Sequence, residues 1–149
     1  MRPPLPVSRG DAFELTEFLL AADLSVDGIG DPDVHLWVDL DPDGRIVGST
    51  GFELDGPDAL LRGIAVHSTL VETGRRIELA RFALDRATSI GATRAWLLGR
   101  RAGALWQDLG FEPADIADLE EALASTHPVQ SLVASSQLAY QTAWSRPLP

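Results

Sequence analysis

The chain has 149 residues, a length that suits one hydrophobic core, so a single domain over 1–149 is expected. It contains no cysteine, and all 12 basic residues are arginine, which excludes disulfides, thiolate metal ligands, a cysteine nucleophile and a lysine Schiff base. A net charge of -10 disfavours nucleic acid and anionic membranes as partners. With no apolar run of membrane-spanning length and no secretory signal, a cytoplasmic location is expected, and the three scattered histidines predict no metal site.

The first half of the chain predicts a helix followed by antiparallel strands. Residues 5–8 could form a short strand, and Asp11 is a plausible N-cap for the helix that follows. The apolar stripe expected on that helix comprises Phe13, Leu15, Phe18, Leu19 and Ala22. Residues 23–30 indicate a short second helix or a structured loop. The turn DPDG at 41–44 joins predicted strands at 34–40 and 45–54, and a second turn at 55–58 leads into a strand over 59–66.

The second half predicts a crossover and a helical tail. The helix from Thr73 should bury a face made of Ile77, Ala80, Leu84, Ala87 and Ile90, and Gly91 should end it. A strand at 94–98, helices at 102–109 and 115–124, and a last strand at 137–145 follow. The crossover makes strands 59–66 and 94–98 parallel. The fold class is therefore α/β (α+β), a mixed central sheet with helices on both faces.

The loop between Val66 and Gly74 is a candidate anion site. Backbone N–H groups at the start of the following helix lack intrahelical acceptors, and Gly74 permits close approach of a ligand to the backbone. Arg75 and Arg76 add positive charge in an acidic chain. The alternative is that Gly74 is a simple turn residue and both arginines are solvated.

Residues 60–74 (LLRGIAVHSTLVETG) resemble the central motif of the GNAT (GCN5-related N-acetyltransferase) family, L-R-x-h-x-V followed by R/Q-x-x-G-x-G/A. Further passages resemble the arsenic-resistance-type branch of that family. These are GSTGFE at 48–53, GATRAWLL at 91–98, Ala102 with LWQDLGF at 105–111, and the spacing of Thr126, Val129, Leu132 and Ser136.

The resemblance implies a GNAT-like acyl-CoA N-acyltransferase fold that transfers acetyl from acetyl-CoA, without a metal, to the amine of a small molecule. Glu53 would be the general base, directly or through water, and the Val66 N–H would stabilise the oxyanion. Arg62 could bind a substrate carboxylate or an oxyanion. The implied cofactor-binding residues are Ile64, Ala65, Val66, Glu72, Thr73, Gly74, Arg75, Arg76, Leu105 and Trp106.

Two departures keep a second interpretation open. Val71 replaces the Arg or Gln of the loop motif, and Arg76 replaces its final small residue, where it either crowds a pyrophosphate or pairs with it. The alternative function is a non-catalytic binding or interaction module with a degenerate loop. The only tyrosine, Tyr140, lies in the tail, so no side-chain acid is evident.

Single residues also have structural, non-catalytic interpretations. Glu53 could be a solvated edge carboxylate, Arg62 could pair with Asp55 or Asp58, and His67 could be structural. Homodimerisation is possible, with residues 138–144 as a contact edge.

Overall fold

The computed structural model describes residues 3–68, 74–99 and 104–149. Within them the chain forms an eight-stranded sheet in the order β1-β2-β3-β4-β6-β8-β7, with β5 pairing β3. The strands are β1 (Leu5–Pro6), β2 (Val34–Leu40), β3 (Ile46–Asp55), β4 (Asp58–Leu61), β5 (Ala65–Val66), β6 (Arg94–Gly99), β7 (Glu112–Ala114) and β8 (Thr142–Pro147). The β4·β6 pair is parallel and the others are antiparallel, which confirms the mixed sheet.

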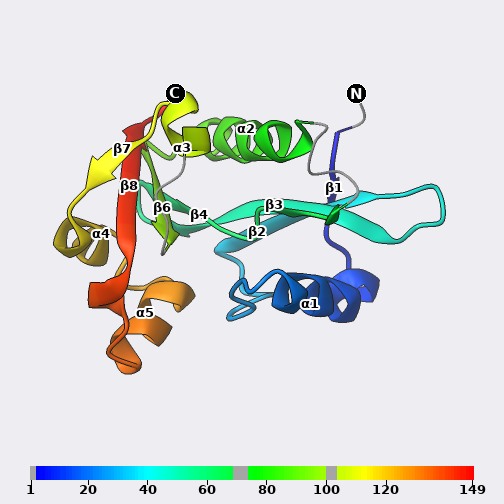
Figure 1. Ribbon diagram of the computed structural model, residues 1–149, viewed down its shortest axis with the longest axis horizontal. Helices are drawn as coiled ribbons and strands as arrows, with labels where there is room; N and C mark the ends of the chain where they lie inside the picture. Colours follow the sequence, from blue (N-terminus) through cyan, green and yellow to red (C-terminus); the bar gives the residue numbers. More distant parts are fainter. Residues whose placement is uncertain (1–2, 69–73, 100–103) are drawn as a thin grey trace.

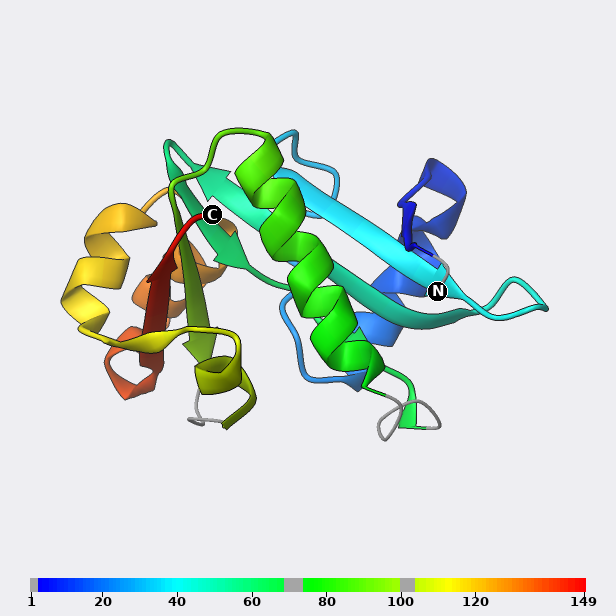
Figure 2. The ribbon, with the colours of Figure 1, turned by 90° about the horizontal axis from the view of Figure 1, so that it is seen from above.

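Helices cover both faces of this sheet (Figure 1). One face carries α2 (Arg75–Ser89) and α3 (Ala104–Asp108), and the other carries α1 (Ala12–Ala21), α4 (Ile116–Ala122) and α5 (His127–Ala134). Short 3-10 turns occur at Arg9–Asp11 and Leu138–Tyr140. The helix α2 crosses the sheet diagonally when seen from above (Figure 2).

The core is divided among three clusters of buried side chains. The largest lies under α2, where the small residues Ala80, Ala83 and Ala87 let the helix approach the sheet closely. On the opposite face, α1 packs Leu15 and Leu19 on β2 and β3, while α4 and α5 form a separate cluster on β4, β6 and β8. The two clusters of this face leave a seam between α1 and α5.

The hairpin, the long helix and the parallel crossover are confirmed. The turn closes through a bond from the Gly44 N–H to the Asp41 carbonyl, 2.9 Å long. Gly91 follows the C-cap of α2 with a φ of 99°, as its predicted role requires. Residues 23–30 are a loop, which was one of the two alternatives.

The predicted strand 59–66 is wrong in one respect, because it breaks into β4 and β5. Three positions separate Phe52 from Ser49 on β3, whereas four separate their partners Leu61 and Ala65. One extra residue is therefore bulged out of the pairing. Gly63 lies in this break with a φ of +70°, a conformation that glycine adopts without steric cost.

Other predictions need correction. Phe13 is 76% exposed, because it lies on the outer side of α1 while Leu15 and Leu19 face the sheet. Ile90 is 45% exposed at the C-cap of α2. Residues 138–140 form a 3-10 turn rather than strand, and β8 lies between β6 and β7. The predicted dimer edge at 138–144 is therefore wrong, because β8 is an interior strand. The elements β7 and α5 were not predicted.

Candidate active site

The sheet opens between β5 and β6. Pairing of β4 with β6 ends at Leu60 and Trp96, and β5 continues alongside β3 alone. The His67 N–H donates to the Val47 carbonyl on β3, so the preceding N–H, that of Val66, points to the opposite edge, toward β6. The break thus directs the backbone of residues 64–66 toward an opening between two strands that diverge.

The N-terminus of α2 lies beside this opening, on the face that α2 and α3 share (Figure 2). Gly74 is its N-cap, with a φ of 75° and no capping side chain. The first-turn N–H groups of Arg76 and Ile77 have no acceptor within the helix, and the helix dipole places positive potential there. This end of α2 therefore has the backbone chemistry of an anion site. Glu72 and Thr73, also predicted to bind the cofactor, lie outside the described residues.

Arg75 does not project toward an anion at this site. Its side chain is about nine-tenths buried and binds Asp39 on β2, with an Nε–Oδ2 distance of 2.7 Å. Glu78 lies 3.5 Å away. The hydrogen bond to Asp39 raises the pKa of Arg75, so the guanidinium of this pair stays protonated. The guanidinium of Arg75 thus ties α2 to β2, and cofactor binding by Arg75 stays a prediction.

Arg76 contacts α3 instead. Its guanidinium carbon lies 5.6 Å from the centre of the Trp106 ring, a cation–π distance. Trp106 also meets Phe111 edge-on at 6.3 Å, and Leu105 packs against the main core cluster. This contact joins α2 and α3 on one face of the sheet. The two predicted roles of Arg76, crowding a pyrophosphate or pairing with it, stay predictions.

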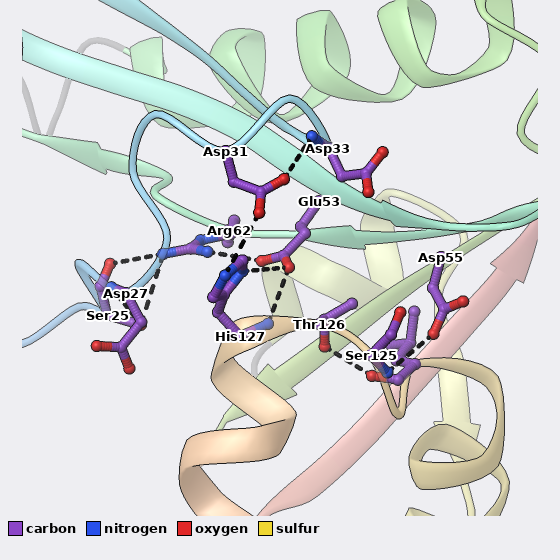
Figure 3. A network of polar contacts seen from close by, with 11 residues as sticks. Ser25, Asp27, Asp31, Asp33, Glu53, Asp55, Arg62, Ser125, Thr126 and His127 are labelled. Carbon is purple, nitrogen blue, oxygen red and sulfur yellow. Dashed lines mark hydrogen bonds and ion pairs between the residues drawn. The ribbon is translucent and has the colours of Figure 1, made fainter.

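Glu53 and Arg62 form a buried ion pair on the opposite face of the sheet (Figure 3). The Arg62 Nη1 donates to Glu53 Oε1 over 2.7 Å, and the side chains are 5% and 2% exposed. Arg62 also donates to the Ser25 carbonyl at 3.2 Å. The structural, non-catalytic interpretations of these two residues are therefore wrong: Glu53 is not solvated, and the partner of Arg62 is neither Asp55 nor Asp58.

His127 completes this network, and sequence analysis missed it. The second oxygen of Glu53, Oε2, accepts the His127 backbone N–H at 2.8 Å and lies 2.7 Å from the imidazole Nδ1. On the other side of the ring, Nε2 is 3.6 Å from Asp31 Oδ2. The sequence Thr126-His127-Pro128 is a helix-start pattern that could have placed His127 in the first turn of α5.

Glu53 lies below the point at which the strands part. Its partner on β4 is Leu60, the last residue that pairs with β6. Gly48, the partner of Val66, is five positions away on β3, about 16 Å at roughly 3.3 Å per residue. Glu53 and Val66 are therefore not adjacent, and Ile64 is the nearest to Glu53 of the three predicted backbone residues.

No group of three or more His, Asp or Glu side chains among the described residues could hold a metal ion. In the same part of the chain, no helix has both the length and the apolar character needed to cross a membrane.

Comparison with solved structures identifies the fold. A putative acyl-CoA N-acyltransferase from Klebsiella pneumoniae subsp. pneumoniae MGH 78578 superposes with a TM-score of 0.74 at 16% identity, covering 100% of this chain and 99% of that one. An acetyltransferase of the GNAT family from Staphylococcus aureus MU50 gives 0.68 at 15% identity and 99% coverage of both chains. N-acetylglutamate synthase from Neisseria gonorrhoeae, crystallised with coenzyme A and N-acetyl-glutamate, gives 0.70 at 16% identity over 99% of this chain and 34% of that one.

The chain thus has the fold of the GNAT acyl-CoA N-acyltransferases, as the motifs implied. No protein-family model and no curated protein sequence matches it.

Proposed function

We propose that the protein is an N-acetyltransferase that moves an acetyl group from acetyl-CoA to an amine. One observation carries the proposal: the sheet parts beside the N-terminus of α2 on one face, and a buried carboxylate network lies near the parting on the other. A phosphorylated donor and an amine could approach from opposite faces and meet between the strands. The structural neighbours named above are acyltransferases of the same fold.

The residues present fit coenzyme A in part. The Val66 N–H faces the opening, and the first turn of α2 from Gly74 to Arg76 offers backbone donors to a pyrophosphate. Leu105 and Trp106 on α3 would flank the pantetheine arm. Acetyl-CoA supplies the thioester, and the N–H of Ile64 or Val66 would stabilise the oxyanion.

The acceptor would dock beneath the parting, beside Glu53. Asp27, Asp31 and Asp33 lie in the loop before β2, and the carboxylate of Asp31 points toward His127 and Glu53 (Figure 3). A protonated amine is the acceptor that this charge favours. The resemblance to the arsenic-resistance-type branch favours an amino-acid-like or toxic small molecule.

Thermal unfolding with acetyl-CoA tests the proposal. A ligand that binds only the native state at 100 times its Kd adds about 2.7 kcal/mol of stability, which raises the Tm by several degrees. ATP, which has phosphates but no pantetheine, is the control and should give a much smaller shift. Release of free CoA in the presence of a primary-amine panel containing spermidine and L-glutamate then reports transfer.

The two assays separate the candidate functions. A shift with acetyl-CoA, together with amine-dependent CoA release, supports the enzyme. Absence of any shift at millimolar acetyl-CoA overturns the proposal and favours the non-catalytic binding module.

A further inference from the structure

We propose that His127 is the catalytic base that removes a proton from the acceptor amine, and that Glu53 is the positioning residue that holds it. This inference rests on the proposed transferase function and deepens it. The starting observation is that Glu53, although it is the predicted base, is buried with both carboxylate oxygens already accepting hydrogen bonds. Oε1 binds Arg62, Oε2 binds the N–H and the ring of His127, and the residue is 2% exposed.

The contact with Glu53 fixes the tautomer of His127. A carboxylate only accepts hydrogen bonds, so the 2.7 Å contact at Oε2 requires the proton to be on Nδ1. In the neutral ring the lone pair is then on Nε2, the nitrogen turned away from Glu53. The His127 side chain is 31% exposed, against 2% for Glu53. Between these two residues, an amine can therefore reach the ring of His127 but not the carboxylate of Glu53.

The orientation of the ring is constrained by packing as well. His127 is the first residue of α5, and its backbone N–H is bound to the carboxylate that holds the ring. Gly28 packs against the imidazole so closely that a Cβ there would lie 2.4 Å from Nδ1. The imidazole is thus held between β3 and the loop before β2 (Figure 3).

The charges around Nε2 suit an ammonium group. Glu53 faces the ring from β3, with Arg62 behind it neutralising that carboxylate. Asp31 faces Nε2 from the loop before β2, with its carboxylate 36% exposed. An ammonium docked against Asp31 would place an N–H next to Nε2. The cationic group of the network, Arg62, contacts Glu53 and not the imidazole.

The transfer balances with His127 in this role. The ammonium gives one proton to Nε2, which later passes it to solvent, and the neutral amine attacks the thioester carbon. The C–N bond forms, the C–S bond breaks, and the second proton of the nitrogen goes to the departing thiolate. The products are an acetamide, free CoA and one proton, and no further reactant is needed.

The test compares His127→Asn with the wild-type chain. Asparagine keeps an N–H donor near the position of Nδ1 but has nothing in place of Nε2. We expect kcat for an amine of the panel to fall by about 100-fold or more at pH 7, with the KM for acetyl-CoA within about 2-fold. The deficit should narrow toward pH 10, where the amine is deprotonated without help. His35→Asn is the control, because His35 stacks on Phe52 away from the network, and its rate should stay within about 3-fold.

A second measurement on the wild-type chain applies even if the variant folds poorly. Long-range 1H–15N spectra, with the His127 ring assigned by elimination through His35→Asn and His67→Asn, should show Nδ1 protonated and Nε2 bare at pH 8. A protonated Nε2 at that pH, or a variant with unchanged kcat and pH profile, overturns the inference while leaving the transferase proposal intact. The absence of a thermal shift with acetyl-CoA would overturn both the transferase proposal and the inference about His127.

Discussion

At the scale of single residues, the Glu53–Arg62 pair decides what a substitution at either position can report. Both side chains are almost fully buried, so each depends on the other for neutralisation. Removing one charge leaves the other without compensation in a poorly hydrated place, which costs about 3–5 kcal/mol. A loss of activity in a single variant would therefore mix catalysis with folding.

We predict that Glu53→Gln and Arg62→Met each lower the free energy of unfolding by about 3–5 kcal/mol, and that the double variant loses less than the sum. The glutamine carbonyl can still accept the two His127 donors, but its NH2 group then faces the Arg62 guanidinium, so both the charge and the acceptor of Arg62 are lost. Urea unfolding of the four chains gives the coupling energy, expected at about 1–3 kcal/mol. The exposed Glu120→Gln should change stability by no more than about 0.5 kcal/mol. Additive losses from the two single variants would show that the pair contributes nothing as a pair.

At the scale of secondary-structure elements, local patterns predicted most of the chain and failed where tertiary contacts decide. The β2–β3 hairpin was predictable because its turn residues and apolar strands lie together in sequence. The break between β4 and β5 was not predictable, because a glycine within an apolar run is compatible with a continuous strand. The break becomes evident only from the pairing of β4 and β5 with β3. The helix α5 was not predicted because Thr126 was considered only as part of the family motif and not as a helix N-cap.

The second prediction concerns Gly63, which lies in the break between β4 and β5. Gly63→Ala should destabilise the protein by about 1–2 kcal/mol from the left-handed backbone alone. An additional loss is expected because the new Cβ would lie 3.1 Å from Leu36 Cδ2. Gly56→Ala is the matched control, since Gly56 has a φ of +59° but no heavy atom within 4 Å of an added Cβ.

Urea unfolding compares the two alanine variants. The difference between them isolates the packing contribution. Equal losses would mean that Leu36 moves aside without cost.

At the scale of the whole molecule, the candidate site lies where distant segments meet, and this is why the sequence predicted Glu53 and Arg62 but neither His127 nor the arrangement. Glu53 and Arg62 were each singled out from motifs, yet their pairing depends on the β3–β4 register. His127 is 74 residues from Glu53 and reaches it only because α5 packs below the sheet. The same polar groups join β3 and the loop before β2 to α5, and they form the proposed acceptor site.

The net charge of the molecule gives the last prediction. With 22 acidic and 12 basic residues, the folded chain concentrates negative charge, and its self-repulsion opposes compaction. Sodium chloride shortens the screening length from about 30 Å at 0.01 M to about 8 Å at 0.15 M, so the Tm should rise by a few degrees over this range. Thermal scans at neutral pH measure the effect, and scans at the pH of zero net charge are the control, where it should vanish. A Tm that falls with salt would mean that attractive surface ion pairs outweigh the repulsion. The buried pairs Glu53–Arg62 and Arg75–Asp39 are poorly screened, so they hold the site and the start of α2 in place at either ionic strength.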